Sequence, residues 1–160
     1  LADVIAFNKR NASREMPFFN QELFEMAEAK GPLTDQQYLD ALAMNRRLAG
    51  PEGIDAVMDQ YQLDALVAPT NCEAWLTDHV NGDAVSGGSS SPAAVAGYPA
   101  ITVPAGQVNG LPVGISFFGR AWSEPRLIKY AFAFEQGTKH RKSPMFYESI
   151  TPSPGASSAR

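Results

Sequence analysis

The run Gly87-Gly88-Ser89-Ser90-Ser91 contains the residue types that come nearest to a reactive site. A serine on a tight glycine turn can act as a nucleophile, and nearby backbone amides can stabilise an oxyanion. Such a serine needs a base, and no His, Lys or Asp stands directly beside the run. The G-x-S-x-G pattern and the lysine of a phosphate-binding loop are also absent. We interpret the run as a flexible loop before a helix; a hydrolase that uses Ser89 or Ser90 is the alternative.

A second candidate is a cysteine–histidine pair, because Cys72 and His79 share one loop with Asp78 between them. Catalytic partners are set by spatial arrangement, and a spacing within a loop fixes no geometry. We therefore interpret these residues as loop residues. The single cysteine excludes an internal disulfide, and His79 and His140 lie too far apart in sequence for a metal-ligand pattern. The sequence predicts no metal and no cofactor.

The loop that carries these residues runs from Thr70 to about Ser90, between a short apolar run and a short helix. The apolar run at 63–68 predicts a strand buried on both faces, as in a parallel or mixed sheet. The helix is expected at 91–97, with Ser91 as N-cap and Gly97 just after its end. Long loops inside compact domains are usually functional or disordered.

The remaining elements follow from helical periodicity, caps and turn residues. The capping box Thr34-Asp35-Gln36-Gln37 predicts a helix that ends at Gly50-Pro51, and Asn109-Gly110 predicts a type I′ hairpin. Further helices are expected at 3–16 (or a turn), 21–30, 51–61 and 123–137, and further strands at 100–104 and 113–119. In the last helix, Leu127, Ala131 and Phe134 should form one apolar stripe, which Ile128 and Phe132 widen.

The composition limits the class of protein. The chain has 160 residues, 44% apolar and 19% charged, with a net charge of −4. It is long enough for one domain with a core. It has no basic cluster, so we expect no nucleic-acid partner, and its apolar runs are too short to span a bilayer, so we expect no membrane partner. The elements predict an α/β fold with helices packed on a partial mixed β-sheet, whose other strands come from elsewhere.

Three blocks give the chain a family resemblance. They are LDALVAPT at 63–70, SPAAVAGYPAITVPAG at 91–106 and GLPVGISFFG at 110–119. In this order they resemble the C-terminal third of the amidase signature family, in the branch that includes bacterial peptide amidases. Residues 2–8, residues 21–22 and the helix with Glu135 are similar to segments of the same family. The resemblance covers residues 1–148, and residues 149–160 are expected to form a flexible tail.

The resemblance implies hydrolysis of carboxamide C–N bonds through a Ser–cis-Ser–Lys triad. That triad lies in the N-terminal portion of such enzymes, and no position here matches it, so we assign no catalytic residue and expect the chain to be inert alone. The loops would line the wall of a pocket for a small-molecule amide. This makes Thr70, Asn71, Ser89 and Ser90 candidate substrate-binding residues, with turn and cap roles as the alternative.

Another function remains open: a stand-alone, non-catalytic binding domain derived from the same fold. The chain begins at Leu1 without Met or a secretory pattern, so we expect further sequence upstream. The location would be cytoplasmic, or exported if a signal was removed upstream. A sheet without its other strands would expose an edge, which predicts a possible homo-oligomer.

Overall fold

The structure is a computed structural model that describes residues 1–85 and 87–143. Its contacts divide the chain into two compact units. The first comprises Leu1–Met44 with Thr77–Gly82, and the second comprises Asn45–Leu76 with Asp83–Arg160. The predicted tail at 149–160 lies outside the described residues. Among the helices that are described, none is long and apolar enough to cross a membrane.

The first unit is built from short helices that one buried glutamine connects. These are α1 (Ala2–Arg10), α2 (Ala12–Glu15) and α3 (Glu22–Glu28). The Gln21 side chain donates to the Ile5 carbonyl oxygen at 3.1 Å and accepts from Asn8 Nδ2 at 3.0 Å. Since a buried amide is costly unless it is hydrogen-bonded, these two bonds explain how Gln21 is accommodated between α1 and α3.

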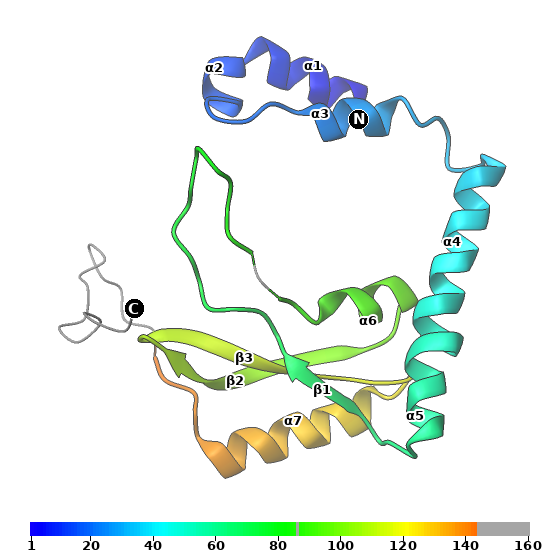
Figure 1. The fold of residues 1–160 in the computed structure, drawn as a ribbon, viewed down its shortest axis with the longest axis vertical. Coiled ribbons are helices and arrows are strands. Elements are labelled where there is room, and N and C mark those ends of the chain that lie inside the picture. Colours follow the sequence, from blue (N-terminus) through cyan, green and yellow to red (C-terminus); the bar gives the residue numbers. More distant parts are fainter. Residues whose placement is uncertain (86, 144–160) are drawn as a thin grey trace. The chain divides into compact units, whose positions relative to one another are not determined.

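The predicted end of an α-helix at Gly50-Pro51 is confirmed, since the α-helix ends at Ala49, but the chain then passes directly into further helical segments over the predicted helix at 51–61. The helix starts at Gln36, one residue later than the capping box predicts, and continues as α4 (Gln36–Ala49), the π-helical segment η1 (Gly50–Asp55) and α5 (Ala56–Gln60) (Figure 1). A proline inside an α-helix clashes with the carbonyl four residues earlier, and the wider π turn accommodates it. Gly53 lies in this turn, where there is no room for a side chain, because a Cβ at this position would lie 2.5 Å from the Leu48 carbonyl oxygen.

The second unit contains a three-stranded sheet in the order β1-β3-β2, with both pairings antiparallel. Its strands are β1 (Leu66–Pro69), β2 (Ala100–Val108) and β3 (Leu111–Phe118). The prediction of an α/β fold with helices on a partial sheet is confirmed, but the sheet was predicted to be mixed, and the strand pairings among the described residues are all antiparallel. β1 is not buried on both faces as predicted: its burial alternates, and Val67 is 53% exposed. The reason is that β1 forms an edge of this sheet.

The predicted type I′ hairpin is confirmed, since Asn109 and Gly110 have φ angles of 51° and 81°. The tight turn lets pairing continue as far as Val108–Leu111, so both strands are longer than predicted. A bulge between Pro104 and Gly106 then shifts the register along β2. Beyond that bulge Thr102 pairs with Ser116.

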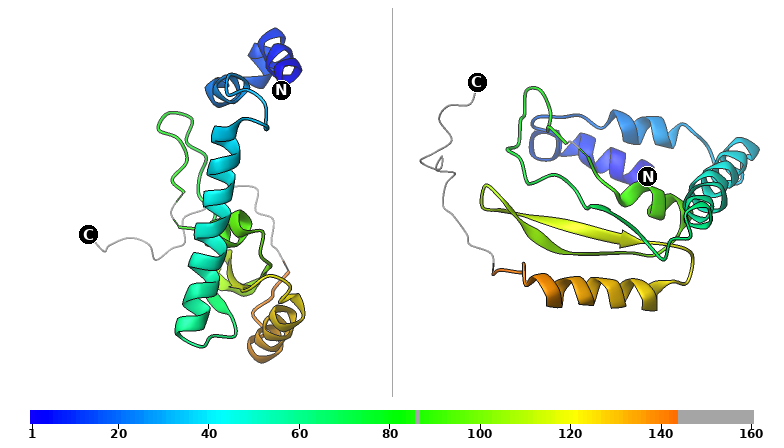
Figure 2. Two further views of the ribbon diagram at one scale, coloured as in Figure 1. Left: turned by 90° about the vertical axis from the view of Figure 1, so that its right-hand side faces the viewer. Right: turned by 60° about the horizontal axis from the view of Figure 1, so that its bottom comes forward.

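Helices cover both faces of the sheet (Figures 1 and 2). Phe118 packs with Ile54, Met58 and Ala93 on the face of α6 (Ser90–Ala96). Phe117, its neighbour in sequence, points to the other face, where it packs with α7 (Glu124–Thr138). The residues of this second cluster are Val103, Phe117, Leu127 and Ala131.

The ends of these two helices differ from the predictions by a few residues. α6 begins at Ser90 with Ser89 at the N-cap position, so Ser91 is not the cap, although Gly97 has the predicted left-handed conformation. Ser123 precedes α7 as predicted, but the helix passes Gly137 and ends at Thr138. The predicted stripe of Leu127, Ala131 and Phe134 faces the sheet. Ile128 and Phe132 do not widen it, because both are exposed.

Candidate functional site

Thr70 joins the end of β1 to two other parts of the second unit. Its N–H donates to the Gly114 carbonyl oxygen at 2.9 Å, and its own carbonyl oxygen accepts from the Ser89 N–H at 3.2 Å. Its hydroxyl oxygen lies 2.8 Å from Ser116 Oγ. Thr70 is therefore bonded to strand β3 and to the residue before α6 at the same time.

The Thr70 hydroxyl belongs to a cluster of three hydroxyl groups on one face of the sheet, which we name the hydroxyl cluster: Thr70, Thr102 and Ser116. Ser116 Oγ lies 2.8 Å from Thr70 Oγ1 and 2.8 Å from Thr102 Oγ1, and the two threonine oxygens are 3.4 Å apart. Ser116 is buried, whereas Thr102 is exposed. Each residue comes from a different strand or strand end.

Asn71 continues the chain from Thr70 into the long loop. It forms an isolated bridge with Gly88, and its side-chain Oδ1 accepts from the Cys72 N–H at 3.0 Å. Three adjoining cavities, of about 440, 350 and 340 Å³, surround this point. Asn71 and Cys72 line all three cavities, so the segment directly after Thr70 forms a shared wall.

The structure brings together three of the four residues that the sequence singled out. Thr70 and Asn71 line the 350 Å³ cavity, and Asn71 and Ser89 line the 340 Å³ cavity. Ser90 is the first residue of α6, is exposed, and lines none of these three cavities. Ser89 Oγ is buried without a hydrogen-bond partner among the described residues.

The sequence did not single out Thr102, Ser116 or Gly114. The signal that could have found them is strand pairing: residues that lie directly opposite in adjacent strands share a face. The hairpin turn alone would pair Val108 with Leu111 and carry that register along the strands. The bulge at Ala105 changes the pairing partner of Thr102. Pro104 and Gly106, which flank it, are the residue types that mark a bulge within a strand.

The polar groups of these cavities favour hydrogen bonding over acid–base chemistry. Cys72 and Glu73 are the titratable residues among those that line the three cavities. The other candidate partner, His79, stacks on Phe18 within the first unit, with ring centroids 3.7 Å apart. Over residues 1–85 and 87–143, no three His, Cys, Asp or Glu side chains are grouped to hold a metal ion.

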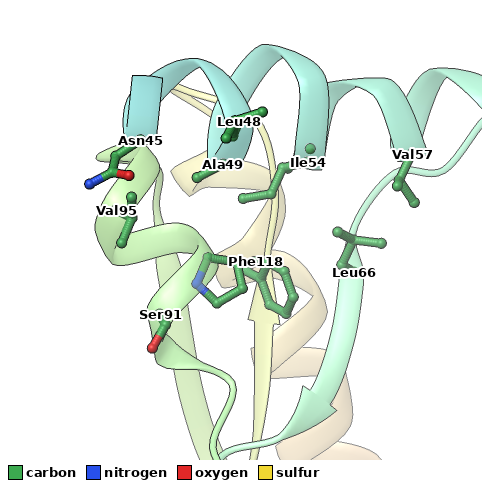
Figure 3. A pocket seen from close by; sticks show the side chains of 11 residues that line it. Asn45, Leu48, Ala49, Ile54, Val57, Leu66, Ser91, Val95 and Phe118 are labelled. Atoms are coloured by element: carbon green, nitrogen blue, oxygen red, sulfur yellow. The ribbon is translucent and has the colours of Figure 1, made fainter. Parts of the chain in front are cut away.

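A larger groove of about 610 Å³ lies between α4, η1 and α6 (Figure 3). Its walls are almost entirely apolar, and Leu48, Val57 and Val95 remain substantially exposed there. Figure 3 shows the Phe118 ring at its base, with Leu66 beside it. The groove has the character of an uncovered part of a core. Its lining residues include Asn45, Leu48, Ile54, Val57, Leu66, Ser91, Val95 and Phe118.

Comparison with known proteins places this arrangement in a family. The sequence model of the Amidase family matches residues 4–128. An Arabidopsis thaliana protein described as a probable amidase is 39% identical over 148 residues, which cover 91% of this chain and 25% of that protein. The native peptide amidase of Stenotrophomonas maltophilia is 52% identical, with a TM-score of 0.82 over 91% of this chain and 29% of that one.

An amidase family protein from Bacillus anthracis is 32% identical, with a TM-score of 0.69 over 91% of this chain and 25% of that protein. The chain thus spans between a quarter and three tenths of the length of these relatives. The family match covers most of the chain, and the similarity extends through the sheet and the loops at Thr70 and Ser89. The chain therefore belongs to the amidase signature family.

Proposed function

We propose that this chain is the C-terminal portion of an amidohydrolase that hydrolyses carboxamide C–N bonds. The observation that carries the proposal is that nearly the whole chain matches less than a third of a peptide amidase at 52% identity. A match of this kind supports a shared fold segment and a shared role within a larger domain.

The chemistry would follow the family's Ser–cis-Ser–Lys mechanism. A serine attacks the amide carbonyl carbon, the C–N bond breaks, and ammonia or an amine leaves with a proton relayed through the second serine and the lysine. Water then attacks the acyl-serine and releases the carboxylic acid. We assign none of these groups to residues of this chain, because the family resemblance places all three in the N-terminal portion of such enzymes. The residues that line the four cavities described above include no lysine.

The contribution of this chain would be sheet strands and one wall of the substrate pocket. Thr70, Asn71 and Ser89 support this role, since they meet where three cavities adjoin. Ser90 is retained as a weaker candidate at the start of α6. The substrate would be a small molecule with a carboxamide group, bound through hydrogen bonds to hydroxyl and amide side chains.

Ammonia release from simple carboxamides tests the proposal. The purified 160-residue chain is expected to release none. The same chain joined to an upstream amidase portion that carries the lysine and both serines is expected to release ammonia. Turnover by the short chain would contradict its proposed inertness, and an inactive longer protein would contradict the assignment as an amidohydrolase.

We also propose that the isolated chain associates with itself through the outer edge of β1. This strand exposes Val67 and has one partner, β3, among the described residues. An unpaired strand edge is a ready template for pairing with another strand. Light scattering should therefore report a dimer or larger species, and a monomer at all concentrations would contradict the proposal.

A further inference from the structure

We infer that Ser116, Thr102 and Gly114 are positioning residues that hold Thr70, and through it fix the pocket wall formed by residues 70–72 and 87–89. The inference rests on the proposed function, because it is that function that makes the wall part of an amide-binding pocket. It adds three residues to which no role in the site has been assigned, and it depends on contacts within the second unit alone.

Ser116 is buried at the centre of the hydroxyl cluster. Its side chain is on a face of β3 next to Phe118, and the residue is only 6% exposed. A buried hydroxyl is unfavourable unless it is hydrogen-bonded, and Ser116 Oγ is bonded to Thr70 and Thr102 at 2.8 Å each. Ser116 is thus the central member of the hydroxyl cluster and connects both threonines across three strands.

The side chains of Thr70 and Thr102 fill the space above Gly114. A Cβ at this position would lie 2.8 Å from Thr70 Oγ1 and 2.9 Å from Thr102 Cγ2. Any larger residue would therefore push the two threonines away from β3. The Gly114 carbonyl oxygen also accepts the Thr70 N–H. Gly114 both leaves room for the Thr70 side chain and holds its backbone.

Thr70 also holds together the two ends of the long loop, at 70–72 and 87–89. The Thr70 carbonyl oxygen accepts the Ser89 N–H, and the next residue, Asn71, bridges to Gly88. The N–H, the carbonyl and the hydroxyl of Thr70 are all engaged. A change that frees the hydroxyl would therefore loosen the point at which residues 70–72 and 87–89 meet.

A purely structural explanation makes a different prediction. Cross-strand Thr–Ser pairs commonly stabilise sheets by a fraction of a kcal/mol. If that were the whole role, loss of one hydroxyl would lower global stability and leave the loops and ligand binding unchanged. The two explanations are separated by measuring loop order and substrate affinity apart from global stability.

Hydrogen exchange on the purified chain provides the first test. Thr70→Val removes the hydroxyl at constant shape, Thr70→Ser keeps it, and Gly114→Ala keeps every hydroxyl but displaces the threonines. We expect amide exchange at 71–72 and 87–89 to be about tenfold faster in Thr70→Val and Gly114→Ala and near wild type in Thr70→Ser. Gly137→Ala is the control, because no atom lies within 4 Å of a Cβ there.

Thr102→Val is a milder variant, because Thr102 is exposed, and it keeps the test valid if the others fold poorly. It is expected to accelerate exchange at the same amides. Unchanged exchange at 71–72 and 87–89 in Thr70→Val, Gly114→Ala and Thr102→Val would overturn the inference. Acceleration that is uniform across the whole second unit would also overturn it, since that would report global destabilisation.

Kinetics of the complete amidase provide the second test. Thr70→Val and Gly114→Ala are expected to raise KM for a carboxamide substrate about tenfold with kcat within about twofold, and Thr70→Ser to restore KM. An unchanged KM in variants with accelerated exchange would overturn the positioning role. If the complete wild-type protein hydrolyses no amide, the proposed function fails, whereas the exchange experiment still decides whether the hydroxyl cluster holds Thr70.

Discussion

The Tyr98 hydroxyl donates a hydrogen bond to Asp55 Oδ2 at 2.7 Å and so connects the turn after α6 to the π-helical segment η1. Gly50 leaves room for this contact, because a Cβ there would lie 3.1 Å from the Tyr98 hydroxyl oxygen. Arg120 lies 3.6 Å from the other oxygen of Asp55 and also pairs with Asp59. The bond therefore belongs to a network that joins η1 and α5 to the sheet.

Removing the Tyr98 hydroxyl should destabilise the second unit. Tyr98→Phe removes the hydroxyl that donates to Asp55 Oδ2 and should lower the free energy of unfolding by about 1.5–3 kcal/mol, as expected for a hydrogen bond to a charged group. Tyr61→Phe is the matched control. The Tyr61 side chain is 62% exposed, so its change should stay within about 0.5 kcal/mol. Urea unfolding of both variants decides this, and equal losses would contradict the prediction.

The hydrogen bond between Tyr98 and Asp55 should make the stability of the second unit depend on pH. The hydrogen bond to Asp55, together with burial, raises the pKa of Tyr98 above its usual 10.0. The folded state thus holds this proton more tightly than the unfolded state. The stabilisation is fully present below about pH 10 and is lost as pH rises through the raised pKa. The difference in Tm between wild type and Tyr98→Phe should narrow above pH 10, and a difference that widens there would contradict the assignment.

The sequence predicted the hairpin correctly because its signal is local. Asn109 and Gly110 both need positive φ, and these residue types adopt it readily. The hydroxyl cluster could not be predicted in the same way. Its existence depends on the bulge between Pro104 and Gly106, which sets Thr102 opposite Ser116. Pro104 and Gly106 are typical of a bulge, but they do not by themselves fix which residues of the two strands pair.

The junction at Gly50-Pro51 follows local rules only in part. The α-helix ends at Ala49 as these residues predict, yet the chain continues directly as η1 and α5. Ile54 and Met58, in the helix predicted at 51–61, are buried in one cluster with Phe118. Within the candidate site, the family resemblance was enough to single out Thr70, Asn71 and Ser89. The residues proposed to hold Thr70 could be identified only from the strand register.

A side chain at position 53 should disrupt the π-helical segment. In Gly53→Ala the new Cβ would lie 2.5 Å from the Leu48 carbonyl oxygen, which is backbone and has little freedom to move. We expect a loss of about 2 kcal/mol in the free energy of unfolding, in the range of overpacked sites. Gly137→Ala in α7 should be neutral or stabilising by up to about 1 kcal/mol. Chemical unfolding compares the two, and a neutral Gly53→Ala would contradict this account of η1.

Asp78 should organise the loop tip in the first unit. Its Oδ1 accepts from the N–H groups of Val80 at 2.8 Å and Asn81 at 2.9 Å, and the backbone bond from Asn81 is the main reason that the pKa of Asp78 lies below its usual 3.8. These bonds are fully present above about pH 4 and weaken as pH falls through the lowered pKa. The upfield shift of the His79 ring protons over Phe18 should disappear in Asp78→Ala.

Asp78→Asn is the control for that experiment, because it keeps an oxygen acceptor in the same place and should retain most of the shift. Titration of the wild type toward acid should weaken the Asp78 bonds, and with them the shift, only below about pH 4. A His79 environment that is identical in wild type and Asp78→Ala would contradict the proposed link between the turn and the ring stack.

Adjacent residues of α7 should respond very differently to truncation. Leu127 is 1% exposed and packs with Val103 and Phe117, so Leu127→Ala should cost about 2–4 kcal/mol. Ile128 is 57% exposed, so Ile128→Ala should change the stability of this chain by no more than about 0.5 kcal/mol. Urea unfolding of both variants measures the two costs, and equal costs for Leu127→Ala and Ile128→Ala would contradict the packing described for α7.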